Sequence, residues 1–206
     1  MDRREFWNFR SRSYDEMVGP KYEDAYRKTA ECSLPYLKNS DRMLEFGCGT
    51  GIMTCALAPH VASVLAIDIS DEMIAHARAK QDAVPNVTFR HLDLFDPSLD
   101  GEQFDVVAAY NVLLYLPDRA VVLRRIRSLL RPGGIFLAAS DCLGQFPTKT
   151  GAKKLWQLVS RQMPSCSFDR IADLEESIRR ADLTLLETQT LFPAPPNVFV
   201  AARKAE

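Results

Sequence analysis

A glycine-rich turn between two short apolar runs constrains the fold of this chain more than any other feature. Residues 43–51 read Met-Leu-Glu-Phe-Gly-Cys-Gly-Thr-Gly, and a second apolar run that begins at Val64 ends in Asp68. The pattern predicts a buried strand, a tight turn that opens a helix, and a second strand that ends in a carboxylate. Only glycine lets a backbone turn this tightly and approach a ligand closely. A carboxylate placed here can reach ribose hydroxyls, so the sequence predicts a site for a nucleoside-containing cofactor.

The spacing of the glycines distinguishes between cofactors. In the dinucleotide fingerprint Gly-x-Gly-x-x-Gly, counted from Gly47, the third glycine would fall on Ile52, so a nicotinamide cofactor is not favoured. Counted from Glu45 as Glu-x-Gly-x-Gly-x-Gly, the segment resembles motif I of the class I S-adenosylmethionine-dependent methyltransferases. The resemblance implies S-adenosylmethionine as the cofactor and methyl transfer as the activity.

Further segments resemble the same family in the same order along the chain. Asp68 matches the acidic end of the second strand, which binds the ribose, and Asp93 matches the carboxylate that meets the adenine amino group. The run from Phe104 matches the fourth strand, and its exit at Asn111 lies where the acceptor should meet the sulfonium. The Leu-Leu-Arg-Pro-Gly-Gly segment from Leu129 matches the turn into the fifth strand.

The resemblance also implies a set of cofactor contacts, although some of these residues have a simpler alternative. Asp68 could instead cap the helix that begins near Ser70, and Ile69 and Met73 could be core residues. Glu45 can orient the loop and assist at the methionine end of the cofactor. The expected cofactor-binding residues are Tyr14, Glu45, Gly47, Cys48, Gly49, Thr50, Gly51, Asp68, Ile69, Met73, Asp93, Leu94, Asn111 and Val112.

Four further residues are expected to bind the methyl acceptor. Trp7 and Tyr22 belong to an aromatic-rich N-terminal segment that resembles the lid of small-molecule methyltransferases, although the aromatics could simply pack on the domain. Tyr115 could bound the methyl-transfer pocket or lie in the core. Asp141 stands where metal-dependent relatives carry an Asp-Asn pair, but Cys142 follows it here, so we expect no metal.

No side chain is assigned as catalytic. Methyl transfer is an in-line displacement that depends mainly on alignment of the acceptor with the sulfonium, and an acceptor with a free lone pair needs no base. An oxygen or protonated amine would need one. Asp141, Tyr115, Tyr14 and His91 are the open candidates.

Apolar runs that alternate with helical patterns predict a parallel sheet with helices on both faces. The expected strands are 42–47, 64–68, 87–92, 104–110 and 134–140, and the expected helices are 51–58, 71–82, 118–130, 153–163 and 169–181.

The last two predicted strands, 183–190 and 197–202, are joined by a short proline-rich link that cannot hold a crossover helix, so they should be antiparallel. Asp182 is a tolerable left-handed residue before them. We therefore expect one α/β domain over 1–206 with a Rossmann-like, seven-stranded, mostly parallel sheet. Residues 1–38 would form a helical lid, 39–140 the cofactor-binding half, and 141–206 the substrate-side helices and final strand pair.

Composition narrows the functional classes. The 206-residue chain has a net charge of −1, so it lacks the broad basic surface of a general nucleic-acid binder. Its longest apolar stretch, near 106–116, is too short for a membrane helix. The five scattered cysteines and three histidines show no ligand spacing and fit a reduced, cytoplasmic protein.

These observations favour a methyltransferase for a small-molecule acceptor, with no nucleic acid and no membrane insertion. An alternative is a macromolecular acceptor such as RNA, protein or a lipid head group. It draws support from the basic cluster of Lys149, Lys153, Lys154 and Arg161 beside Trp156, which could equally be a solvated helix face. A non-catalytic module that binds S-adenosylmethionine is a third possibility. The identity of the acceptor atom and the oligomeric state are not specified by the sequence.

Overall fold

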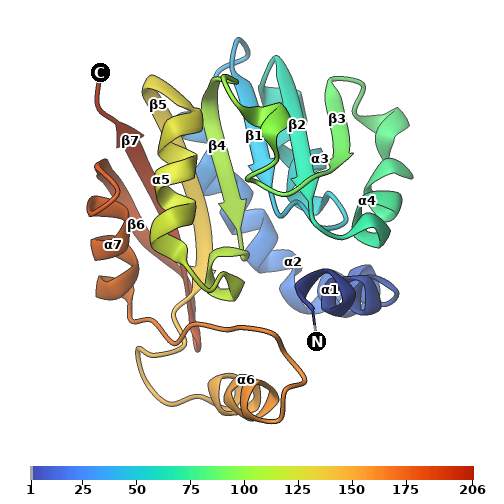
Figure 1. Ribbon diagram of the computed structural model, residues 1–206, viewed down its shortest axis with the longest axis vertical. Coiled ribbons are helices and arrows are strands. Elements are labelled where there is room, and N and C mark those ends of the chain that lie inside the picture. Colours follow the sequence, from blue (N-terminus) through green and yellow to red (C-terminus); the bar gives the residue numbers. More distant parts are fainter. Residues whose placement is uncertain (1) are drawn as a thin grey trace.

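The structure is a computed structural model that describes residues 2–206, with the side chains of 17–21 left out. A seven-stranded sheet runs through it in the order β3-β2-β1-β4-β5-β7-β6 (Figure 1). Neighbours from β3 to β5 are parallel, whereas β7 is antiparallel to both β5 and β6. The strands are β1 Arg42–Phe46, β2 Ser63–Asp68, β3 Val87–His91, β4 Phe104–Tyr110, β5 Leu130–Asp141, β6 Leu183–Pro193 and β7 Pro196–Lys204.

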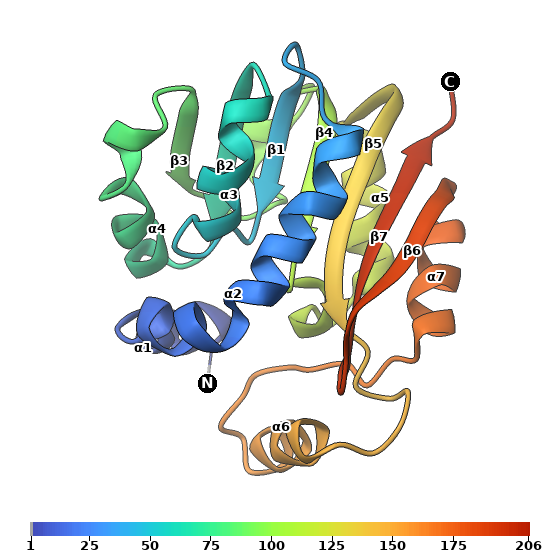
Figure 2. The ribbon, with the colours of Figure 1, turned by 180° about the vertical axis from the view of Figure 1, so that it is seen from behind.

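Helices cover both faces of this sheet, which confirms the predicted Rossmann-like architecture. In Figure 1, α5 and α7 lie on the near face, and Figure 2 shows α2 and α3 on the opposite face. The helices are α1 Arg3–Ser11, α2 Tyr14–Ser33, α3 Ile52–Leu57, α4 Asp71–Arg78, α5 Arg119–Leu129, α6 Lys149–Val159 and α7 Ile171–Arg179.

The core consists of two apolar layers, one on each side of the sheet. Leu44 and Phe46 of β1 belong to the layer under α5 and α7, whereas Met43 belongs to the layer under α3 and α4. Because both faces are covered, the central strands read as continuous apolar runs rather than as an alternating pattern. Phe104, Phe136 and Phe199 are fully buried.

The parallel strands bring the predicted site residues to one edge of the sheet. Gly47 follows β1, Asp68 ends β2 and Asn111 follows β4, so all three lie at the carboxyl ends of neighbouring strands. In open α/β sheets this edge is where ligands bind. Helices α1 and α6 lie beneath the same edge (Figure 1).

The boundaries of two predicted helices differ most from the structure. The helix expected at 153–163 is α6, which begins at Lys149 because Thr148 caps it: the Thr148 hydroxyl accepts a hydrogen bond from the Gly151 backbone at 2.9 Å. It ends at Val159, shortly before Arg161 takes a left-handed conformation. The helix expected at 71–82 ends at Arg78, and the chain turns into a short 3-10 helix over Gln81–Ala83.

Strand β5 begins at Leu130 rather than at 134, because Leu130 already pairs with Phe104 before a bulge interrupts the register. The antiparallel arrangement of β6 and β7 is confirmed, but their connection is shorter than predicted. Pairing continues to Pro193 and Pro196 and leaves a two-residue turn. Asp182 has a φ of 56°, as expected for a left-handed residue after a helix. Among the described residues, no helix is long and apolar enough to cross a membrane.

Candidate active site

The glycine loop after β1 adopts a conformation that only glycines can hold without strain. Gly47, Gly49 and Gly51 have φ values of 67°, 55° and 80°. A Cβ atom on Gly47 would lie 2.6 Å from Cγ2 of Val112, so the loop passes too close to the chain beyond β4 for any side chain. A Cβ atom on Gly49 would meet no atom within 4 Å. The second glycine therefore borders open space, and the loop backbone is accessible to a ligand there.

Asp68 fastens this loop to the end of β2. Its carboxylate accepts hydrogen bonds from the Gly49 backbone at 2.9 Å and from the Ser70 backbone at 2.8 Å. Burial raises the pKa of Asp68, although the backbone hydrogen bonds partly offset that effect. The cap of α4 is Ser70, whose hydroxyl accepts from the Met73 backbone at 3.1 Å. Ser70, rather than Asp68, therefore caps this helix, and Asp68 lines the cavity.

Glu45 lies under the loop as a buried carboxyl group. Its side chain accepts a hydrogen bond from the Thr54 hydroxyl at 2.7 Å, and burial raises the pKa of Glu45 to about 8. A small cavity beside Glu45 is also lined by Tyr14, Tyr26 and Tyr110. A buried acid at the wall of a cavity suits a cationic ligand group, because the cation would compensate the cost of ionising the carboxyl.

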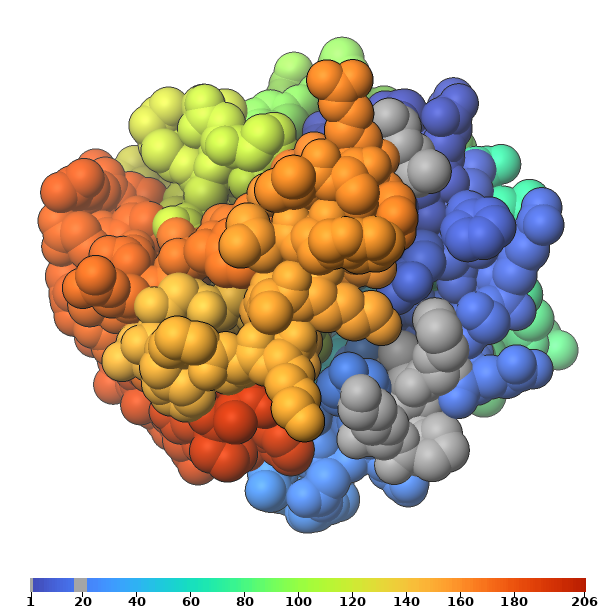
Figure 3. Space-filling view, turned by 90° about the horizontal axis from the view of Figure 1, so that it is seen from below, coloured from blue at the N-terminus to red at the C-terminus, as the bar shows by residue number. Residues whose placement is uncertain are grey.

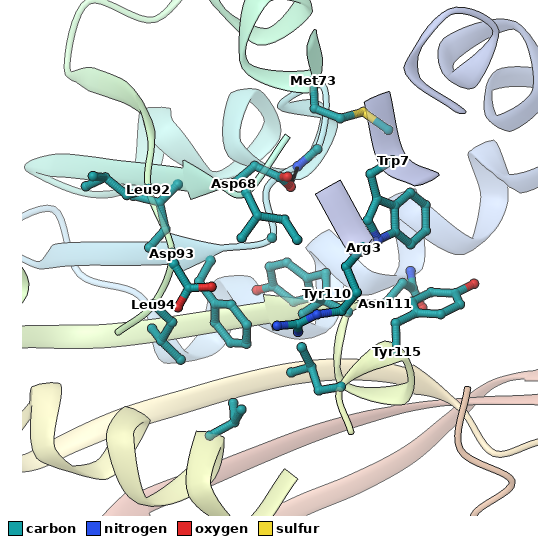
Figure 4. A pocket seen from close by; sticks show the side chains of 18 of the residues that line it. Arg3, Trp7, Asp68, Met73, Leu92, Asp93, Leu94, Tyr110, Asn111 and Tyr115 are labelled. Atoms are coloured by element: carbon teal, nitrogen blue, oxygen red, sulfur yellow. Dashed lines mark hydrogen bonds between the residues drawn. The ribbon is translucent and has the colours of Figure 1, made fainter. Parts of the chain in front are cut away.

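A larger cavity continues from the glycine loop along the strand ends (Figure 4). Asp68 and Asp93 stand on one side of it, and Tyr110, Asn111 and Tyr115 stand on the other. Twelve of the predicted site residues line this cavity: Trp7, Tyr14, Gly47, Gly49, Asp68, Ile69, Met73, Asp93, Leu94, Asn111, Val112 and Tyr115.

The remaining predicted residues have other positions. Glu45, Cys48 and Thr50 line the smaller cavity. The other three predicted residues line neither cavity. Gly51 precedes α3 and packs close to Phe89. Tyr22 lies on α2 and is 43% exposed, and Asp141 is the last residue of β5. Residues that the sequence reasoning missed also line the larger cavity: Arg3, Phe46, Ile67, Leu92, Phe95, Tyr110, Leu116 and Val122.

Helix α1 covers the larger cavity and is fastened beside it. Figure 4 shows Arg3 and Trp7 extending from α1 over the space between Asp68 and Asn111. Asn8 accepts a hydrogen bond from the Ser70 hydroxyl at 2.6 Å and donates one to Asp71 at 2.8 Å. The N-terminal helix is therefore attached to the same turn that follows the Asp68 strand.

Helix α2 is attached to the glycine loop itself. Asp15 accepts hydrogen bonds from the Thr50 hydroxyl and, at 2.9 Å, from Lys80 Nζ. Lys80 also donates to the Thr50 carbonyl at 2.7 Å. Burial alone would raise the pKa of Asp15, but the contacts with Thr50 and Lys80 outweigh it and lower the pKa. The N-terminal segment and the loop thus share a small polar cluster.

The far end of the larger cavity is built around Tyr115. The Trp7 ring meets the Tyr115 ring edge-to-face with centroids 5.0 Å apart. Lys154 of α6 donates a hydrogen bond to the Tyr115 hydroxyl at 2.7 Å and lies 3.7 Å from an Asp141 carboxylate oxygen. Burial works to lower the pKa of Lys154, but Tyr115 and Asp141 outweigh it and leave the pKa raised.

A short amide network joins this end to the last strand. Asn197 of β7 donates from Nδ2 to Asn111 Oδ1 at 2.9 Å and to Asp141 Oδ1 at 2.8 Å. Asn111 has a φ of 55°, a conformation that asparagine tolerates better than most residues. Neither Asn197 nor Lys154 belonged to the predicted site, because nothing in their local sequence indicates contact with the end of β4.

A parallel sheet with a glycine loop after β1 and a buried carboxylate at the end of β2 defines a Rossmann-like protein that binds a nucleoside cofactor. A family model described as a methyltransferase domain matches residues 44–136. A ubiquinone biosynthesis O-methyltransferase of Acinetobacter baumannii is 29% identical over 168 residues, which cover 75% of this chain and 68% of that protein.

Solved structures agree with this class. A complex of DhpI with SAH matches with a TM-score of 0.75 and 23% identity, over 98% of this chain and 95% of that one. The methyltransferase complex with the Trm112 activator of Haloferax volcanii matches with a TM-score of 0.80 and 19% identity, over 100% and 98% of the two chains. On these similarities the protein is a methyltransferase that uses S-adenosylmethionine as its cofactor, and its fold is the one that the class I enzymes share.

Proposed function

We propose that this enzyme transfers the methyl group of S-adenosylmethionine to a small-molecule acceptor that binds beside Tyr115. The observation that carries the proposal is the enclosure of this end of the cavity. Trp7 of α1 packs on Tyr115 from one side, and Lys154 of α6 holds the Tyr115 hydroxyl from another. An acceptor of small size fits between such walls more readily than a folded macromolecule does.

The residues around the cavity fit the proposed cofactor. The open space beside Gly49 allows close approach to the loop backbone, and Asp68 places a buried carboxylate at the rim where ribose hydroxyls would bind. Glu45 would pair with the ammonium of the methionine part, and Asp93 and Leu94 would meet the adenine. When bound, S-adenosylmethionine supplies a methyl group on a sulfonium that any well-placed nucleophile can accept.

The chain's own contribution to the reaction would be orientation. Tyr115, fixed by Trp7 and Lys154, would hold the acceptor in line, and closure by α1 would exclude water. Burial raises the pKa of Tyr115, so its phenol stays protonated near neutral pH and serves as a hydrogen-bond donor rather than as a base. Lys154, with its raised pKa, would favour an acceptor that carries negative charge.

An unbiased acceptor screen tests the proposal. Purified enzyme is incubated with methyl-labelled S-adenosylmethionine and a cell extract that has been separated into a small-metabolite fraction and a macromolecular fraction. We expect label in the metabolite fraction with wild-type enzyme and much less with Asp68→Ala at the same cofactor concentration. Label confined to RNA or protein would overturn the small-molecule proposal while leaving the methyltransferase assignment intact.

A protein partner is a second candidate because the Haloferax volcanii relative is found in a complex with Trm112. At 19% identity this similarity shows only that the two proteins share a fold. The complex with Trm112 is therefore a property of the Haloferax volcanii protein. Label in the macromolecular fraction that appears only when a small activator protein is added would favour this second candidate.

A further inference from the structure

Helix α6 presents an apolar face to the outside of the molecule. Leu155, Trp156 and Val159 are 50%, 60% and 76% exposed, and Phe146 in the preceding loop is 44% exposed. Val159 lies four positions after Leu155 and three after Trp156, so the three side chains form one stripe on the helix. Single exposed apolar residues are ordinary, but a contiguous group on one helix marks a surface that binds something.

The charge of this segment indicates what that surface binds. Residues 142–168 contain Lys149, Lys153, Lys154 and Arg161 and no aspartate or glutamate, although the whole chain has a net charge of −1. Lys154 is directed inward to Tyr115, whereas Lys149, Lys153 and Arg161 are exposed. Lys153 lies three positions before Trp156 and Lys149 seven, so both lysines lie along one side of the apolar stripe. The surface is therefore an apolar stripe with a basic border.

We propose that α6 and the preceding loop form a docking surface for an anionic membrane. A short amphipathic helix with tryptophan and aliphatic side chains on one face and lysines beside them is suited to the interface of a bilayer with acidic head groups. Self-association through the same stripe is less suitable, because a symmetric pair would bring the lysines of both copies together with no acidic residue in the segment to neutralise them.

The position of α6 gives the surface a consequence for the acceptor. Figure 3 views the molecule from below and shows α6 spread across this face beside α1, which covers the cavity. Lys154, on the inward side of α6, contacts Tyr115 of the cavity wall. Docking would thus bring the acceptor end of the cavity toward the bilayer. This part of the inference rests on the proposed function: the acceptor would be an amphiphile drawn from the membrane.

Vesicle binding tests the surface without acceptor or cofactor, so its failure and the failure of the proposed function are separable. Full-length enzyme is mixed with phosphatidylcholine vesicles with or without phosphatidylglycerol, and binding is measured by flotation. We expect binding only to the anionic vesicles. The chain has two tryptophans, and a Trp7→Phe variant leaves Trp156 as the only source of tryptophan fluorescence. The emission maximum of Trp156 should shift to shorter wavelength when the anionic vesicles are added.

Two sets of substitutions then test the two components of the surface. Trp156→Ser with Val159→Ser should weaken binding by about tenfold or more, whereas Leu186→Ser, at an exposed leucine of β6, should leave binding unchanged. Lys149→Glu with Lys153→Glu should weaken binding by about tenfold or more. Each variant is checked by circular dichroism.

Three results would overturn the proposal. The first is no flotation of the wild-type protein with anionic vesicles. The second is flotation that the α6 substitutions leave unchanged. The third is a wild-type dimer that becomes monomeric on Trp156→Ser, measured by light scattering, because the stripe would then serve self-association.

Discussion

The two ends of the cavity are held together in different ways. At the cofactor end, neighbouring segments of chain meet through backbone groups: the Gly49 and Ser70 amides both donate to Asp68. At the end proposed for the acceptor, Trp7, Tyr115, Lys154 and Asn197 come from four separate elements and make their contacts through side chains. The first arrangement follows from the fold, and the second depends on which side chains the outer segments carry.

This difference explains how one fold can serve many acceptors. The carboxyl ends of β1, β2 and β4 place the glycine loop and Asp68 together in any sheet of this order. The wall proposed for the acceptor depends on α1 and α6, which lie outside the sheet, so it can change without disturbing the core. We therefore expect substitutions to affect cofactor affinity most at the loop and least at Lys154.

The largest loss of cofactor affinity should follow Gly47→Ala. The new Cβ would lie 2.6 Å from Val112 Cγ2 at a φ of 67°, so the loop would have to move away from β4. We expect S-adenosylmethionine binding to fall by more than about 100-fold in calorimetry, since backbone placement is lost. Gly133→Ala is the matched control: Gly133 has a φ of 73° and open space around it, so stability should fall by about 1 kcal/mol with affinity unchanged.

Glu45→Gln should have a smaller effect on cofactor affinity than Gly47→Ala, and the effect should depend on pH. With a pKa of about 8 in the free protein, Glu45 is largely protonated at neutral pH and must ionise to pair with an ammonium. Wild-type affinity should therefore rise as pH increases toward 8, where the carboxylate forms while the ammonium of the cofactor is still protonated. Near pH 8 the Gln variant should bind about tenfold more weakly, and it should lack the Glu45 contribution to this slope. Parallel slopes in the two proteins would contradict the role of Glu45.

The same carboxyl makes a prediction about stability. Its pKa in the folded protein is raised from 4.5 to about 8, so the folded state holds the proton more tightly. The free energy of unfolding should fall as pH rises from 4.5 to 8, by at most about 1.4 kcal/mol per pH unit. Urea unfolding of Glu45→Gln should show this decline removed, and an unchanged decline would show that another group causes it.

Asp15→Ala should reduce cofactor affinity moderately, because it removes the contacts between α2 and the glycine loop. Loss of the contacts with Thr50 and Lys80 leaves the loop less restrained, and cofactor affinity should fall by about fivefold. Asp24→Ala removes an acidic residue of α2 whose salt bridges stay within that helix, so it should change affinity little. Equal losses in both variants would indicate a general effect on α2.

The smallest effect on the cofactor should come from Lys154→Met. Lys154 contacts Tyr115 and Asp141 at the acceptor end, so cofactor affinity should change by less than about twofold. Turnover of the acceptor found in the screen should fall, whereas Lys28→Met on α2 should keep both properties. A large loss of cofactor affinity in Lys154→Met would remove the distinction between the two ends.

The same distinction accounts for what the sequence could predict. The positions of Gly47 and Asp68 at the cavity could be predicted because they follow from strand ends and glycine spacing, which are visible in the local sequence. The contact of Lys154 with Tyr115 spans 39 positions and that of Asn197 with Asn111 spans 86, and no local pattern indicates either. The start of α6 was also misplaced, because Thr148 was not recognised as its cap.

The N-terminal segment could be predicted from the sequence only in part. The sequence predicts a helical lid over residues 1–38, the structure has helices there, and Trp7 lines the cavity. Tyr22, predicted from the same pattern, lies on α2 away from it. The sequence did not indicate Arg3, which lies one helical turn before Trp7 and faces the same cavity (Figure 4). Which face of α1 is turned inward depends on the contacts of Asn8 with Ser70 and Asp71.

Calorimetry of S-adenosylmethionine and S-adenosylhomocysteine with wild type and Asp68→Ala tests the central claim most directly. We predict micromolar binding to the wild type and a loss of about 10- to 100-fold in the variant. Asp96→Ala, which removes a half-buried carboxylate that accepts a hydrogen bond from the Ser98 backbone amide, should bind as wild type does. No binding by the wild type, or equal binding by a folded Asp68→Ala protein, would contradict the assignment of this cavity as the cofactor site.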